Sequence, residues 1–337
     1  MPSLIAKFSL SFCLLLLTGC SNAGNHNMTE FTWSATESAP KDFPMEIIKG
    51  TFLFKGEEHG LYIPDGGTLT GGWGNSISSH GSITHGLPDR LDITFFSYAE
   101  KKYYHGKFEL PYDRIVELFQ QGVETNKEHP SYSKLMAGIA PGGVVSVWVK
   151  GKYAVEVFFG QADEVDLDPS YAFDLPFSSV EESDAYIAKQ LPNSLSPEQL
   201  ESLEKNGIPL DLWTRYRNRY NWFAKAKDDT IYGFFLKYVN GESERDHFPF
   251  LEGEELRNLP VPRKMSFKTK KYIYEVNFDD IEIVSAFEQL NAHENLTEEQ
   301  RRIAMEFDLQ YPRSNSSVKI YNAKESIELK KVVFADW

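Results

Sequence analysis

Two segments of the chain, separated by about 170 residues, carry the same pattern. Residues 87–119 and 259–287 both begin with Leu-Pro, alternate apolar and polar positions, contain Lys-Lys-Tyr and end in an amphipathic segment that closes with Phe. Such alternation is typical of half-buried strands. A looser similarity relates residues 144–159 to residues 317–334. This repeat indicates an internal duplication, so we expect two related, β-rich domains.

The hydrophobic periodicity predicts many short strands and a few short helices. Residues 91–97 and 144–149 alternate, whereas the apolar positions of residues 113–121 and 279–290 recur at helical spacing. Short turns join several strand pairs, which favours antiparallel sheets. The helices cluster instead of alternating with the strands, so we predict an α+β fold and not a doubly wound α/β fold.

The composition changes near the middle of the chain. Residues 166–206 are rich in Pro, Ser, Asp and Glu, and within them residues 196–199 form a capping box that begins a helix. We interpret this segment as a linker with helices of its own. The predicted divisions are a signal peptide (residues 1–19), a tether (20–28), a first β-rich domain (29–165), the linker (166–206) and a second β-rich domain (207–337).

The N-terminus has the features of a lipoprotein signal. Lys7 precedes an apolar stretch at residues 8–17, which is too short to span a bilayer, for which about 20 residues are needed. The stretch ends in Leu-Thr-Gly-Cys at residues 17–20, which resembles the lipobox of bacterial lipoproteins. The resemblance implies cleavage before Cys20 and its modification with three acyl chains, palmitate among them, which suffice for stable anchoring. The alternative is an ordinary secretory signal in which the Cys occurs by chance.

The resemblance also implies a location in the cell. Ser21 stands where an Asp would retain such a protein in the inner membrane, so we expect the periplasmic face of the outer membrane. Cys13 leaves with the signal and Cys20 is used for the anchor, so we expect no intrachain disulfide. The formal net charge of −14 argues against a nucleic-acid partner.

Familiar catalytic motifs are absent from the sequence, which contains no Gly-x-Ser-x-Gly, His-Glu-x-x-His or Cys-x-x-Cys. Gly72 and Gly74 begin like a dinucleotide-binding fingerprint, but Ile77 occupies the position of the third glycine. We therefore predict that the protein is not an enzyme and takes no cofactor and no metal ion.

A glycine-rich loop at residues 66–86 holds candidate contact residues. His80 and His85 could bind a metal ion or present a recognition surface, and Trp73 would act as an exposed aromatic anchor. The two histidines have carboxylates only beyond the loop ends, which makes a weak metal site. The alternative is a mobile surface loop between strands.

Two further clusters each allow a functional and a structural interpretation. The carboxylates at positions 163, 164, 166 and 168 could bind calcium, but they lack the Gly and the distal Glu of an EF-hand loop, which favours a solvated acidic linker. Residues 98–105 could form an active-site cluster, or a hairpin whose cross-strand aromatic pairs include Tyr103 and Tyr104.

Several phrases distinguish the first part of the chain. They are Phe-Pro-Met-Glu at residues 43–46, Gly-Trp-Gly at 72–74, Phe-Ser-Tyr-Ala-Glu-Lys-Lys-Tyr-Tyr at 96–104, Leu-Pro at 110–111 and Gly-Ile-Ala-Pro-Gly-Gly-Val-Val at 138–145, with Trp148 and Gly151 after them. Together they resemble a family of bacterial lipoproteins known as domain of unknown function 2931 (DUF2931). In the second part, Gln-Tyr-Pro-Arg at residues 310–313 stands where Ala-Pro-Gly-Gly would fall, so the resemblance is weaker there.

The resemblance implies no catalytic residue. Some lipoproteins of this kind look like immunity partners of lipase toxins that bacteria deliver to one another. We therefore expect a protein-binding lipoprotein, anchored to the membrane by Cys20, that blocks a secreted (type VI-type) phospholipase toxin. A structural or envelope-assembly lipoprotein without a toxin partner is the alternative, and an adjacent lipase-toxin gene would favour immunity. The candidate contact residues are Trp73, His80, His85, Tyr103 and Tyr104.

Overall fold

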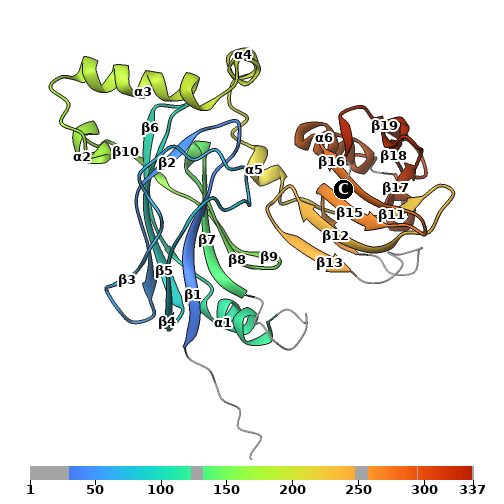
Figure 1. Cartoon of the computed structure of the whole chain (residues 1–337), viewed down its shortest axis with the longest axis horizontal. Helices are drawn as coiled ribbons and strands as arrows, with labels where there is room; N and C mark the ends of the chain where they lie inside the picture. Colours follow the sequence, from blue (N-terminus) through green and yellow to red (C-terminus); the bar gives the residue numbers. More distant parts are fainter. Residues whose placement is uncertain (1–29, 123–131, 247–256, 294, 336–337) are drawn as a thin grey trace, which may run out of the picture.

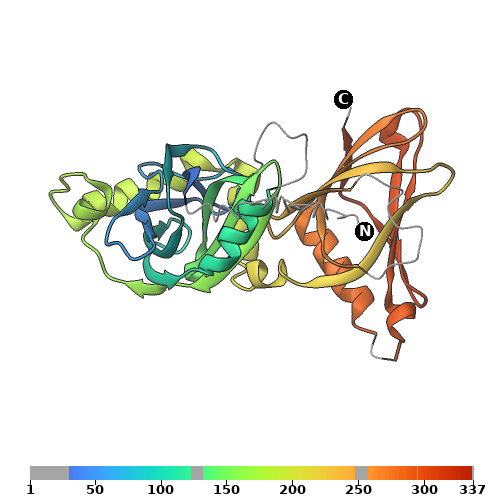
Figure 2. The same ribbon diagram turned by 90° about the horizontal axis from the view of Figure 1, so that it is seen from below.

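The structure is a computed structural model that describes residues 30–122, 132–246, 257–293 and 295–335. These residues form three β-sheets, of ten, five and five strands, with short helices around them (Figure 1). We call β1 to β10 the first half and β11 to β20 the second half; the two lie side by side along the long axis of the molecule (Figure 2). The fold is a β-rich α+β fold, as the sequence predicted.

The ten-stranded sheet begins in the first half. β1 (Phe31–Ser38) is antiparallel to β4 (Ser79–His85) on one side and parallel to β7 (Tyr132–Ala140) on the other. β7 continues through β8 (Val144–Gly151) and β9 (Ala154–Gln161) as an antiparallel meander. Part of the glycine-rich loop is therefore a strand, β4, because its backbone pairs with β1 at the edge of the sheet.

A five-stranded antiparallel sheet packs against these strands. Its order is β10 (Asp163–Val165), β6 (Lys102–Glu109), β5 (Pro88–Ser97), β2 (Met45–Phe54) and β3 (Gly60–Tyr62). Apolar side chains from both sheets fill the space between them. The first-half core formed in this way includes Trp33, Phe52, Phe95 and Leu135.

Three helices occupy the segment interpreted as a linker: α2 (Pro169–Phe173), α3 (Val180–Ser194) and α4 (Pro197–Asn206). α2 and α3 pack on one end of the outer face of the five-stranded sheet, so this end of the sheet is covered on both sides. α4 begins with the capping box that the sequence predicted. The small cluster under α2 and α3 contains Phe96, Tyr98, Tyr103, Ala172 and Ile187.

The second half repeats the strand order of the first. β11 (Arg219–Ala226) is parallel to β17 (Ile303–Asp308), as β1 is to β7. β17 continues through β18 (Ser317–Tyr321) and β19 (Ser326–Leu329) as an antiparallel meander, as β7 does through β8 and β9. β14 (Asn258–Pro260) extends this sheet beside β11.

The remaining strands show the same correspondence. β12 (Tyr232–Tyr238), β15 (Pro262–Lys268) and β16 (Ile273–Phe278) are antiparallel neighbours, like β2, β5 and β6. α6 (Asp280–Asn291) follows β16, just as α1 (Tyr112–Gln121) follows β6. The repeated topology confirms the internal duplication that the sequence predicted.

Equivalent connections also carry equivalent short helices. η1 (Pro141–Gly143) joins β7 to β8, and η2 (Arg313–Asn315) joins β17 to β18. Residues 310–313 therefore stand in the place that Ala-Pro-Gly-Gly takes in the first half. α7 (Glu298–Arg301) precedes β17.

The two halves share the ten-stranded sheet. β13 (Ser243–Asp246) pairs with β12 and is bridged to β9 through Ser243 and Ala154, so the sheet runs from β4 to β20 (Val332–Ala335). α5 (Leu212–Arg215) lies between the halves (Figure 1). Within the described ranges, no helix has the length and apolar character that a membrane span requires.

Candidate functional site

The Gly-Trp-Gly phrase lies at the junction of the two halves, inside an apolar cluster to which both contribute. Trp73 is 3% exposed, and its ring centroid lies 5.0 Å from that of Trp148 in β8 and 6.4 Å from that of Trp213 in α5. The prediction of an exposed anchor at Trp73 is wrong, because this cluster buries the indole ring. Trp73 instead packs the loop of the first half against the second half.

The strand β8 is packed on both faces. Val145, Val147 and Val149 belong to the first-half core, whereas Val144 and Trp148 belong to the cluster at the junction. Because successive side chains of a strand point to opposite faces, one short strand can join two cores. The second half therefore packs directly on the sheet of the first half.

Arg263 of β15 fastens the Trp73 loop to the second half. Its Nη1 donates to the backbone oxygen of Trp73 at 2.5 Å, and its Nη2 donates to that of Val239 at 3.2 Å. Its Nε and Nη2 also donate to Asp280 at 2.9 and 2.5 Å, a bidentate pair. Burial lowers the pKa of Arg263, but the contacts with Asp280 and Tyr216 together raise it, and the net direction of the pKa shift is upward. The guanidinium therefore stays charged where it satisfies buried acceptors from both halves.

The backbones of the two halves meet at a pair of glycines. Gly74 has a φ of +80°, and a Cβ there would lie 2.3 Å from the Cα of Gly241. Gly241 has a φ of +86°, and its own Cβ would lie 2.9 Å from both the Cα of Gly74 and the ring of Trp148. Trp148 Nε1 donates to the backbone oxygen of Asn240 at 3.1 Å. This approach is possible only without side chains at positions 74 and 241.

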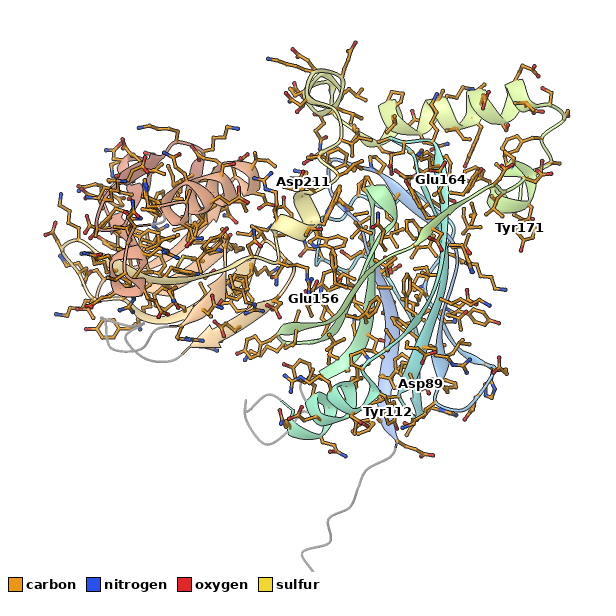
Figure 3. The ribbon with its side chains drawn as sticks, turned by 180° about the vertical axis from the view of Figure 1, so that it is seen from behind. Asp89, Tyr112, Glu156, Glu164, Tyr171 and Asp211 are labelled. Carbon is orange, nitrogen blue, oxygen red and sulfur yellow. The ribbon has the colours of Figure 1, made fainter. Side chains whose placement is uncertain are left out.

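Polar contacts surround the apolar junction. Glu156 of β9, which lies between the halves in Figure 3, accepts from Nε of Arg217 at 2.8 Å and from Oγ of Ser146 at 2.7 Å. Its side chain is 9% exposed, and burial raises its pKa despite these partners. The backbone N–H of Ala154 donates to Oγ of Ser243 at 2.9 Å, beside the bridge between β9 and β13.

The structure buries Tyr103 and Tyr104, at 7% and 5% exposure, so the expectation that they present a contact surface is wrong. Tyr103 packs against Phe96, with ring centroids 4.5 Å apart, under the cover of α2. Tyr104 faces the opposite side of the sheet and stacks on Phe95 with ring centroids 5.4 Å apart. β6 is covered on both faces at these two positions, and the cross-strand aromatic pairs of the hairpin interpretation are present.

Glu100 connects two of the family phrases. Its Oε1 accepts from the Tyr104 hydroxyl at 2.9 Å, and its Oε2 accepts from the backbone N–H of Gly142 at 3.0 Å. Gly143, beside it, has a φ of +77°, and a Cβ there would lie 2.4 Å from the backbone oxygen of Ala162. Burial, followed by the Glu100 carboxylate, raises the pKa of Tyr104. These contacts give the Pro-Gly-Gly turn a structural role.

The structure does not bring His80 and His85 together. They stand at the two ends of β4, and a strand rises about 3.3 Å per residue, so their separation rules out a shared metal ion. His80 is exposed, whereas His85 is partly covered by the ring of Phe54, with centroids 3.8 Å apart.

A different group around His85 could hold a metal ion. Glu57, His59 and His85 place one ligand atom each within 4.8 Å of the others, and two imidazoles with a carboxylate are a zinc donor set. Nε2 of His59 already lies 2.7 Å from Oε2 of Glu57, so a direct contact between the two side chains accounts for the closest approach. The sequence interpretation missed Glu57 and His59 because they belong to the turn after β2, which reaches β4 only in the folded chain.

The other predicted clusters are distributed over separate contacts. Asp168 caps α2 by accepting from the backbone N–H of Ser170 at 2.8 Å, and Glu164 pairs with Nζ of Lys102 at 2.6 Å. Cys20 lies outside the described residues.

The protein is a β-rich α+β protein made of two repeated halves. A buried tryptophan cluster packs the two halves together. The family model of DUF2931, described as "Protein of unknown function", matches residues 21–211, and the chain belongs to this family. The match covers the first half and α2 to α4 and ends at the start of α5. No curated protein and no solved structure matches the chain.

Proposed function

We propose that the protein is a lipid-anchored envelope protein that acts by binding another protein, and that this partner is a secreted phospholipase toxin. The observation that carries the binding role is the use of the family phrases as scaffold. The phrase at residues 72–74 locks the halves together, and the phrases at residues 96–104 and 138–145 meet through Glu100. Because these phrases are used for internal contacts, partner contacts would fall to the exposed side chains of the surface.

Two exposed apolar side chains, one of them aromatic, are candidate contact residues in place of the buried Trp73, Tyr103 and Tyr104. Tyr171 of α2 is 72% exposed and lies at the outer end of the first half (Figure 3). Val180, which begins α3, is 71% exposed on the same helical cover. Aromatic side chains at accessible positions are typical of the centres of protein interfaces. The net charge of −14 would steer a basic partner toward this acidic surface.

The membrane anchor is tested by replacing its sulfur. We expect Cys20→Ser to move the protein from the membrane pellet to the soluble fraction, because the acyl chains have no other attachment point. Cys13→Ser is the matched control, since Cys13 would be removed with the signal, and it should leave the protein in the pellet. Membranes are washed with high salt and with carbonate before immunoblotting. A Cys20→Ser protein that resists both washes would contradict the anchor.

The immunity role is tested in cells that express a lipase toxin in the periplasm. We expect co-expression of the full-length protein to restore growth, and the toxin to co-purify with it after detergent extraction. Toxins encoded beside the gene are the first candidates. If each of them kills equally fast with and without the protein, the immunity role is wrong and a structural role in the envelope is favoured.

A further inference from the structure

A cavity of about 410 Å³ opens beside the junction, between the ends of β8 and β12 and the start of β15. Its size is in the range of small-molecule binding sites. The cavity is unusual for a chain of net charge −14, because cations dominate its lining. Its charged residues are Lys150, Lys152, Lys237, Arg263, Lys264 and Glu242.

Several of these charges are neutralised by neighbours. Arg263 pairs with Asp280, and Nζ of Lys264 lies 2.7 Å from Oε1 of Glu275. Glu242, the single acid of the lining, is paired with Arg219. These contacts account for the charges along β15 but leave those of β8 and β12.

Three lysines of the lining have no ion pair with a carboxylate among the residues that the structure describes: Lys152, which is exposed, and Lys150 and Lys237, which are partly buried. Lys150 donates from Nζ to the backbone oxygen of Gly74 at 3.1 Å, which is a neutral acceptor, and the Glu37 carboxylate offsets only part of the lowering of its pKa. Lys237 reaches the same cavity from β12, on the other half of the molecule. Burial lowers the pKa of Lys150 to about 8, and the charge of Lys237 contributes to this shift. Burial also lowers the pKa of Lys237. Groups whose charged form is disfavoured by burial and by a neighbouring like charge are typical of functional sites.

We propose that the cavity binds a phosphate ester, with the ammonium groups of Lys150 and Lys237 donating to its oxygens. A dianionic phosphate compensates two lysines at once, which a single carboxylate does not. The volume exceeds that of the phosphate group alone and leaves space for a polar substituent such as glycerol. Asn75, Tyr153 and Asn277 supply neutral hydrogen-bonding groups for that part of the ligand. The inference does not depend on the function proposed above.

The phosphate group could belong to a free metabolite or to a lipid headgroup, and calorimetric titration separates the two. The full-length protein, purified in non-ionic detergent, is titrated at pH 7 with sn-glycerol 3-phosphate and with short-chain dihexanoyl phosphatidic acid. We expect saturable binding of both probes if the phosphate ester alone is recognised. Markedly tighter binding of the phosphatidic acid would assign a lipid headgroup, and acetate should not bind.

The lysines are tested with the double variant K150M/K237M, which should weaken binding of glycerol 3-phosphate by about 100-fold, since each charged hydrogen bond contributes roughly tenfold. K189M, on the exposed surface of α3, is the matched control and should bind like the wild type. The near-ultraviolet circular dichroism of each variant establishes that it is folded. Absence of saturable binding to the wild type, or equal affinity of the folded double variant, would overturn the proposal.

The pH dependence gives a second readout. Binding of glycerol 3-phosphate should weaken by about tenfold between pH 7 and pH 9.5, because Lys150 loses its proton near pH 8 while the phosphate stays dianionic. An affinity that is unchanged or rises with pH would contradict the role of Lys150. Two charged groups, Glu37 of β1 and Lys134 of β7, act on Lys150 from outside the cavity lining. The charged groups that line the cavity with it are Lys152, Lys237 of β12, Glu242, and Arg263 and Lys264 of β15.

Discussion

Replacing Gly74 with Ala is expected to lower the free energy of unfolding by about 3 kcal/mol. An alanine at the φ of +80° is strained by about 1–2 kcal/mol, and its methyl group would lie 2.3 Å from the Cα of Gly241. Neither backbone can give way without moving one half of the molecule against the other, and overpacking of this kind adds about 1–3 kcal/mol. Urea denaturation followed by tryptophan fluorescence measures the change.

Gly66→Ala is the matched control for this substitution. Gly66 has nearly the same φ, +78°, but no atom lies within 4 Å of the position its Cβ would take. We expect a loss of about 1–2 kcal/mol from backbone strain alone. The difference between the two variants isolates the contact between the halves. Equal losses for Gly66→Ala and Gly74→Ala would contradict the close approach at Gly241.

Trp73→Ala should be the most damaging single substitution at the junction, with a loss of about 4 kcal/mol. The indole is 3% exposed and packs between Trp148 and Trp213, so its removal leaves a cavity that the two rings cannot fill. The backbone contact of Arg263 remains in the variant, so the loss reports the side chain. Urea denaturation measures the loss in the free energy of unfolding, and limited proteolysis of the folded protein gives a second measure of it.

Trp73→Phe keeps an aromatic ring in the cluster and is expected to lose about 1–2 kcal/mol. If Trp73→Ala unfolds at the same urea concentration as the wild type, the tryptophan cluster does not hold the halves together.

The repeat could be predicted from the sequence because it depends on local patterns. The alternation in residues 91–97 and the helical spacing in residues 279–290 correspond to β5 and α6, and both are set by neighbours along the chain. The parallel pairing of β1 with β7 could not be predicted in this way, because about a hundred residues separate the two strands. The same limit applies to β11 and β17.

The candidate site was less predictable, because its residues meet only in the folded chain. A tryptophan flanked by glycines is typical of an exposed loop, and nothing near Trp73 indicates that Trp148 and Trp213 cover it. Tyr103 follows the alternation of a strand with one solvent-exposed face, but α2 covers that face. The lysines of the cavity come from β8, β12 and β15, so no spacing along the chain connects them.

The central claim is that the tryptophan junction makes one cooperative unit of two repeated halves. Differential scanning calorimetry of the protein tests it most directly, because two-state unfolding requires the halves to melt together. We predict a single transition for the wild type and separate transitions for Trp73→Ala. Two resolved transitions in the wild type would contradict the claim.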